Sequence, residues 1–269
     1  MDTLTGGVFL AGLGLFLGAN SFTIGLLASL PFLAQVIQFP TVKLLLHVRD
    51  RRKVVVTAAA LSRTLLVVLG VVLLLEAERL DATRLLIVMG LVGLAVVVAS
   101  AGWNWWMRDL IPREELGRFF ARRMQLTTIA SAAALLVAGW GLDRYVDRGL
   151  TPQGYGILFV LGGLTGLVGV IFLARTPHPE PTVASTRRRA IELVTTVLRH
   201  PQHRPLVLSL TFLAGTLTIA LPFTAVFMLR TLGYSFLAIT VLTLVGQLAY
   251  IESLRGWGCL LYTSPSPRD

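Results

Sequence analysis

One arginine, Arg63, lies deep inside a long apolar segment of this sequence. It follows Lys53 by ten residues, which is about 15 Å along a helix, and the segment 54–75 carries no other charge. A charge in such a setting is costly and usually functional. Arg63 is therefore a candidate contact for an anion or a solute carboxylate, or for an acid such as Glu252. The alternative is a structural arginine bonded to carbonyl groups.

Uncharged polar residues interrupt other apolar segments. They are candidates for lining a solute pathway, and the alternative is that they bond neighbouring helices. Together with Arg63, the pathway candidates are Gln35, Asn104, Gln125 and Gln247. Three tryptophans end one of the apolar segments, and we expect them to anchor it at a membrane interface. They are Trp103, Trp105 and Trp106.

The sequence lacks the residue patterns of a metal site and of a nucleotide-binding site. The pair His200-x-x-His203 has no further metal ligands beside it, and the one cysteine is Cys259, near the end of the chain. No nucleotide-binding loop of the form G-x-x-x-x-G-K-[ST] occurs. We therefore expect no enzyme activity, no metal and no cofactor. The net charge of +10 arises from loops between apolar segments, so we expect no nucleic-acid partner.

Composition and segment length define the elements that must position these residues. Hydrophobic residues make up 55% of the chain and charged residues 14%, against about 25% charged in ordinary soluble domains. The mean hydropathy is +0.75. Apolar runs of about 20 residues are long enough to cross a hydrocarbon core of about 30 Å. The sequence predicts an all-α, polytopic membrane protein with the lipid bilayer as its partner.

The apolar segments are arranged around one long polar interval, Arg175–Pro205. The predicted helices are Leu4–Ala19, Gly25–Leu46, Val54–Leu75, Arg84–Met107, Gln125–Leu142, Gly156–Ala174, Leu206–Leu229 and one that starts near Ser235. A polar loop is expected over Arg108–Met124. We divide the chain into a six-helix bundle (1–174), a cytoplasmic linker (175–205) and the start of a second bundle (206–258). Residues 259–269 resemble the read-through of a sequencing adapter and are left out of this division.

Small residues indicate where the predicted helices approach one another. Such groups are Gly14-x-x-x-Gly18, Ser131–Ala134 and Gly162-x-x-x-Gly166. The loops carry a second signal, because Lys and Arg gather in every other one. Sixteen of the 24 lie in the loops before the third, fifth and seventh helices, and five lie in the other loops between predicted helices. This bias predicts a cytoplasmic location for the three basic loops and for the N-terminus.

Two of the basic loops carry a family resemblance. The loop His47-Val-Arg-Asp-Arg-Arg-Lys53 resembles the signature G-x-x-x-D-R-x-G-R-[RK] of the major facilitator superfamily. Aligned on Arg51-Arg52, it has His47 at the family's aspartate and Asp50 at its second glycine. The stretch from Pro112 to Gly117 is similar to a P-x-x-x-x-G loop at the same place in that family. The alternative is that the first loop is merely basic.

The resemblance covers residues 1–258 and implies a function. It implies helices 1–8 of an expected 12, so the chain is interpreted as a fragment of a bacterial cytoplasmic-membrane protein. It also implies a secondary active transporter that moves a small solute by alternating access, with a proton or another ion as candidate coupling partner. The implied cytoplasmic gate residues are His47, Asp50, Arg51 and Arg52. Two alternatives are the membrane subunit of an ATP-driven exporter and a membrane scaffold or sensor that transports nothing.

Overall fold

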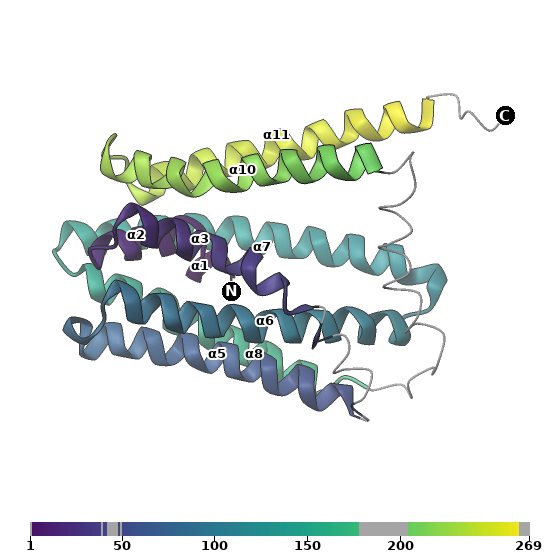
Figure 1. Ribbon diagram of the computed structural model, residues 1–269, viewed down its shortest axis with the longest axis horizontal. Coiled ribbons are helices and arrows are strands. Elements are labelled where there is room, and N and C mark those ends of the chain that lie inside the picture. The colour runs from purple at the N-terminus through teal and green to yellow at the C-terminus, as the bar shows by residue number, and fades with distance from the viewer. Residues whose placement is uncertain (1, 39, 42–47, 49, 178–203, 264–269) are drawn as a thin grey trace.

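The computed structural model describes residues 2–38, 40–41, 48, 50–177 and 204–263. Within these residues the chain forms a bundle of long helices that lie roughly parallel to one another, and it contains no strand (Figure 1). This architecture confirms the predicted all-α class. The helices, labelled as in Figure 1, are α1 (Asp2–Thr5), α2 (Gly7–Phe16), α3 (Ser21–Gln35), α5 (Arg51–Leu75), α6 (Ala82–Leu110), α7 (Arg113–Asp147), α8 (Thr151–Arg175), α10 (Arg204–Arg230) and α11 (Phe236–Thr263), with a 3-10 turn, η1 (Ala77–Arg79).

The bundle has two ends that we name by what connects there. At the linker end α8 finishes and α10 begins, and at the distal end short connections join α5 to α6, α7 to α8 and α10 to α11 (Figure 1). We call α1 to α8 the first half of the molecule and α10 with α11 the second half. The three basic regions of the described chain, at the start of α5, between α6 and α7, and from the end of α8 to the start of α10, all lie at the linker end (Figure 1).

Four of the described helices contain segments long and apolar enough to cross a membrane. These segments are Arg52–Leu75, Ala82–Asn104, Glu114–Asp147 and Thr151–Arg175. Shorter apolar helices span Thr3–Phe16, Ser21–Gln35 and Phe236–Ala249. A chain with several such helices is a transmembrane protein, as its composition predicts.

Side-chain caps explain where several helices begin. Asn20 accepts the backbone N–H of Thr23 at 2.8 Å and so caps α3. Asp81 accepts the N–H of Arg84 at 2.7 Å at the start of α6. Each cap satisfies one of the N–H groups that the first turn of a helix leaves without a partner.

The first predicted helix, Leu4–Ala19, is broken in the structure. Gly6 has an extended backbone and Gly7 has φ +53°, so α1 ends at Thr5 and α2 starts after the break. Gly18, expected at a helix contact, instead has φ +73° and nothing lies within 4 Å of a Cβ placed there. Its N–H bonds the carbonyl of Leu15 at 3.0 Å, which closes the end of α2.

The predicted loop Arg108–Met124 is mostly helical, which corrects the sequence interpretation. α7 starts at Arg113 and runs for 35 residues, so it extends the predicted span Gln125–Leu142 in both directions. Pro112 immediately precedes it, and Glu114 and Glu115 lie in its first turn, where acidic groups interact favourably with the helix dipole. The charged content that suggested a loop belongs to a helix that continues beyond its apolar part.

Two other predicted boundaries also differ from the structure. α3 ends at Gln35, whereas a helix to Leu46 was expected, and residues 42–47 lie outside the described part of the chain. The helix expected from Ser235 begins at Phe236 and continues to Thr263. It therefore passes Gly258, the last residue of the predicted second bundle.

The first half is held together by the close contact of α5 with α8. A Cβ on Gly70 of α5 would lie 2.7 Å from the backbone nitrogen of Val160 and 2.8 Å from the carbonyl oxygen of Gly156. A Cβ on Gly163 would lie 2.9 Å from the carbonyl oxygen of Arg63. Glycine thus allows the two backbones to touch, which is how helices in membranes gain packing without a hydrophobic driving force.

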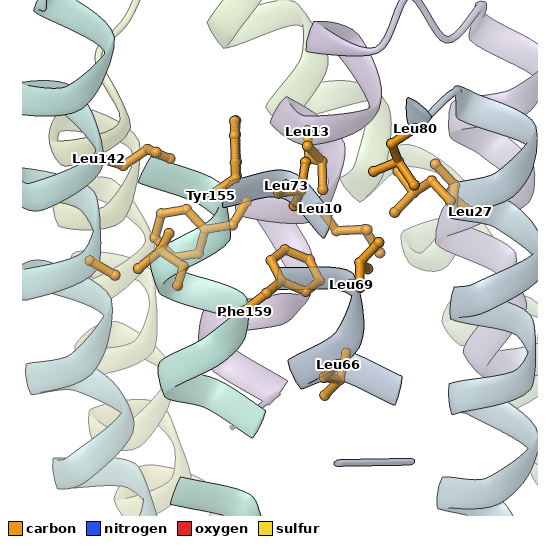
Figure 2. Packing of buried hydrophobic residues seen from close by; sticks show 14 of the residues in the cluster. Leu10, Leu13, Leu27, Leu66, Leu69, Leu73, Leu80, Leu142, Tyr155 and Phe159 are labelled. Atoms are coloured by element: carbon orange, nitrogen blue, oxygen red, sulfur yellow. The ribbon is translucent and has the colours of Figure 1, made fainter. Parts of the chain in front are cut away.

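Buried side chains gather in two clusters. Figure 2 shows the larger one, in which leucines of α2 and α5 point toward Tyr155 and Phe159 of α8, and Phe236 of α11 also belongs to it. The smaller cluster contains Val55, Trp106 and Met107. The larger cluster joins the two halves of the molecule, because residues from both contribute to it.

The structure corrects the role expected for one tryptophan. Trp106 is 3% exposed, and its Nε1–H donates to the carbonyl of Pro177 at 2.9 Å, so it is a packing residue rather than an interface anchor. Trp103 is partly buried, and its ring lies edge-on to Phe120 with the guanidinium of Arg123 4.3 Å from the ring centre. The side chain of Trp105 lies outside the described part.

Candidate solute site between the two halves

A cavity of about 670 Å³ lies between the two halves of the molecule. Helices α2, α3 and α6 of the first half line it, with Thr5 of α1 and Leu66 of α5, and α10 and α11 of the second half also contribute to the described wall. The volume falls within the range of about 300–1,000 Å³ usual for small-molecule sites. The cavity therefore has the size and the position of a solute site shared by both halves.

The wall of the cavity is mainly apolar, with a few polar side chains. The polar ones are Thr5, Gln35, Thr224 and Thr243. No charged side chain lines it among the residues that the structure describes. Apolar walls with a few hydrogen-bonding groups are typical of ligand pockets, in which the polar groups fix the orientation of the ligand.

Small residues of α3 and α6 shape one side of this wall. Gly93 of α6 and Ala28 of α3 both line the cavity. A Cβ on Gly93 would be 3.7 Å from the Cβ of Ala34, which is an ordinary van der Waals contact. Gly93 thus lines the cavity and has room for a Cβ beside Ala34 of α3, without a close backbone contact.

The structure brings one of the five predicted pathway residues to the cavity. Gln35, the last residue of α3, lines it. Asn104 of α6, Gln125 of α7 and Gln247 of α11 are exposed and do not line this cavity. Their proposed contacts with a solute remain predictions.

Arg63 is half-buried on α5 and lies outside the cavity lining. Its guanidinium donates to the hydroxyl of Ser62, a residue with no exposed surface. Its carbonyl oxygen faces Gly163 of α8, so this turn of α5 belongs to the α5–α8 contact. Contact of Arg63 with a solute or an acid remains a prediction.

The predicted gate loop is described in part. Asp50 accepts the backbone N–H of Lys53 at 3.2 Å and its Oδ2 is 3.4 Å from the Lys53 ammonium, so the carboxylate caps α5. This is the interaction that a helix N-terminus favours. Arg52 is half-buried, while His47 and the side chain of Arg51 lie outside the described part of the chain. The gating role of these four residues remains a prediction.

Sequence reasoning missed the residue that most directly links the halves. Asp143 of α7 accepts two backbone N–H groups of α11, from Phe236 at 2.8 Å and from Leu237 at 2.8 Å. The residue stands just beyond the predicted end of its helix, where it looked like an ordinary loop charge. Its partners lie more than 90 positions further on, so no local pattern in the sequence could have revealed the contact.

Four helices of membrane-spanning length in the first half, together with a solute-sized cavity between the two halves, are features of helical membrane transport proteins. The chain belongs to the Major Facilitator Superfamily, whose family model matches residues 1–257. No match was found among curated proteins or among solved structures. Members of this family are typically transporters rather than enzymes. The chain is accordingly a multi-pass membrane transporter.

Proposed function

We propose that this protein is a secondary active transporter that moves a small solute by alternating access, with a proton or another ion as coupling partner. The observation that carries the proposal is the cavity whose wall comes from both halves. When a site lies between two helical bundles, a rocking motion of one against the other exposes it to each side of the membrane in turn. Such a site needs no nucleotide or covalent chemistry.

Within this proposal, Gln35 is the solute-binding candidate that the cavity supports. Its amide group offers both donors and an acceptor, and Thr224 and Thr243 line the same cavity from the second half. A solute bound to Gln35 and to either threonine would bridge the halves. Arg63, Asn104, Gln125 and Gln247 are supported by their positions in the sequence alone.

A transport assay with paired tryptophan substitutions tests the proposal. The full-length protein encoded by the gene is reconstituted into liposomes with an imposed pH gradient, and uptake is measured for a panel of radiolabelled sugars, amino acids and amphipathic cations. Gly93→Trp adds a large side chain to the cavity wall, whereas Gly169→Trp adds the same side chain on α8, where nothing lies within 4 Å of a Cβ. We expect uptake to be lost in the first variant and retained in the second.

Gln35→Ala gives a second arm of this assay. Loss of a hydrogen bond to the solute would weaken apparent affinity by about fivefold or more, since one such bond contributes about 1 kcal/mol. The proposal fails if no solute is taken up by the wild-type protein, or if Gly93→Trp and Gly169→Trp transport equally well.

We further propose that the linker end faces the cytoplasm of a bacterial cell, together with the N-terminus. The support is that the basic regions share this end and that basic loops are retained in the cytoplasm. Single cysteines at Gly117, near the linker end, and at Arg148, at the distal end, test it; both residues are exposed. In intact cells an impermeant maleimide should label Arg148→Cys and not Gly117→Cys. The reverse pattern would place the protein the other way round.

The proposed organisation is a first bundle over 1–174, a linker over 175–205 and a second bundle from 206, with His47, Asp50, Arg51 and Arg52 at a cytoplasmic gate. Resequencing the gene across the codon of Gly258 tests the second bundle. A frame that continues into about four more apolar spans would support it, and a frame that ends at Asp269 would favour a scaffold role. The gate is tested by Asp50→Ala, which should change the transport rate.

A further inference from the structure

The carboxylate of Asp143 joins the two halves through the first turn of α11. Its Oδ1 accepts the N–H of Phe236 at 2.8 Å, and its Oδ2 accepts the N–H of Leu237 at 2.8 Å. Asp143 belongs to α7 of the first half, and α11 belongs to the second half. Both carboxylate oxygens are therefore used in a contact between halves.

α11 also has a cap of its own, which makes the role of Asp143 distinct. Ser235 accepts the N–H of Ala238 through its hydroxyl at 3.1 Å, and its carbonyl accepts the N–H of Ile239 at 3.2 Å. The two N–H groups that Ser235 leaves unsatisfied are the ones that Asp143 accepts. A full negative charge at the positive end of a helix dipole makes these bonds stronger than those of a neutral cap.

The surroundings of Asp143 hold the two helices close together. One turn earlier on α7, a Cβ on Gly139 would lie 2.7 Å from the hydroxyl oxygen of Thr240. The Phe236 ring stacks with Phe9 at 6.1 Å between centroids and meets Tyr155 edge-on at 6.2 Å. Phe236 is 9% exposed and Asp143 is half-buried, so the contact is partly shielded from water, which strengthens charge-assisted hydrogen bonds.

The position of this contact relative to the cavity suggests what it does. The α11 residues that line the cavity, Ile239, Leu242 and Thr243, follow Phe236 within two turns in the direction of the linker end. The Asp143 contact therefore lies on the distal side of the cavity. A rocking motion that parts the two halves at the distal end separates α7 from α11 and breaks both hydrogen bonds.

We infer that Asp143 is a positioning residue that latches the two halves at the distal end and thereby sets how often the cavity opens to that side. This inference rests on the proposed transport function, because it assigns Asp143 to one of the two states of the cycle. The latch needs no ligand of its own. When the halves separate at the distal end, α11 loses the cap that Asp143 supplies, and the free energy of this cap favours the state in which the distal end is closed.

Accessibility of one cavity residue tests the latch without requiring transport. Cys259 is replaced by serine, and Thr243, which is exposed and lines the cavity, is replaced by cysteine. The rate of labelling by an impermeant maleimide is then measured from the distal side in intact cells. Asp143→Asn removes the charge and one of the two acceptors. We expect labelling to become about tenfold faster, the factor that corresponds to the loss of one charge-assisted hydrogen bond.

Two control variants separate the latch from general loosening. Ser235→Ala removes the other cap of the same helix, and Asp147→Asn removes the same charge one turn further along α7, where the residue is exposed. Both should label at the rate of the parent within about twofold. Total labelling in detergent corrects for the amount of folded protein. Equal acceleration by Ser235→Ala, or no acceleration by Asp143→Asn, would overturn the inference.

A second variant covers the case in which Asp143→Asn does not fold. Leu237→Pro removes one donor and keeps the carboxylate, and proline is tolerated in the first turn of a helix. It should also accelerate labelling, and an unchanged rate would overturn the latch. Failure of the two proposals can be told apart. Faster labelling of the Asp143→Asn variant without uptake of any solute would support the latch and refute the transporter. Uptake of a solute with an unchanged labelling rate would support the transporter and refute the latch.

Discussion

Replacing Gly70 with alanine should destabilise the protein even though alanine is the better helix former. Gly70 lies in the interior of α5, where alanine would ordinarily gain about 0.8–1.0 kcal/mol over glycine. Its Cβ, however, would stand 2.7 Å from the backbone nitrogen of Val160 and 2.8 Å from the carbonyl oxygen of Gly156. Because both neighbours are backbone atoms, no side chain can rotate away.

The size of the effect follows from these distances. Ordinary contacts of a Cβ begin at 3.4 Å, so α5 and α8 would have to separate by several tenths of an ångström along their contact. Overpacking of this kind costs about 1–3 kcal/mol. After the gain in helix propensity is subtracted, Gly70→Ala should lower the free energy of unfolding by about 0–2 kcal/mol.

A matched substitution removes the uncertainty in helix propensity. Gly169 lies in the interior of α8 and nothing is within 4 Å of a Cβ there, so Gly169→Ala has the propensity gain without the clash. The two variants should therefore differ by about 1–3 kcal/mol, the full cost of overpacking. In detergent micelles this corresponds to a melting temperature at least about 2 °C lower for Gly70→Ala, at about 2–4 °C per kcal/mol.

Thermal unfolding followed by tryptophan fluorescence measures this difference. Gly163→Ala supplies an independent repeat, because its Cβ would lie 2.5 Å from the Val67 side chain and 2.9 Å from the carbonyl of Arg63. If Gly70→Ala and Gly163→Ala are as stable as Gly169→Ala, then α5 and α8 do not pack backbone to backbone, and the reasoning about this interface is wrong.

Three further predictions concern single interactions. Trp106→Phe removes the hydrogen bond to the Pro177 carbonyl and should lower the free energy of unfolding by about 0.5–1.5 kcal/mol in a denaturant titration. Asp81→Ala removes the cap on the Arg84 N–H and should lower it by about 0.5–2 kcal/mol, whereas Asp81→Asn should keep most of it. Gly149→Ala places a side chain at φ +72° and should cost about 1–2 kcal/mol, seen as a lower melting temperature.

Local patterns in the sequence predicted the helical class and most of the helices. The segment Val54–Leu75 matches α5 to within three residues, and Gly156–Ala174 lies inside α8. These predictions succeeded because hydropathy and length act within one segment. The prediction of a loop over Arg108–Met124 was wrong. Charge content indicates that a segment is exposed, but it does not indicate whether the exposed segment is helical.

The helix contacts were predicted less well than the helices. The pattern Gly162-x-x-x-Gly166 pointed to α8 as a packing helix, yet the backbone contacts with α5 form at Gly156 and Gly163, seven residues apart. Many glycines in an apolar helix satisfy a small-residue pattern. Which of them faces a neighbour depends on the rotation of the helix, and packing against α5 sets that rotation.

By itself the sequence determined that the chain crosses a membrane in several helices, and its loops carried the family resemblance that the family model confirms. Tertiary structure decided which polar residues meet. It brought Gln35 to a cavity between the halves, kept Arg63 on the α5–α8 contact, and joined Asp143 to α11. The physical reason is distance along the chain. Hydropathy is a property of neighbours in sequence, whereas a carboxylate and a helix N-terminus that are 93 residues apart meet only after the halves have packed.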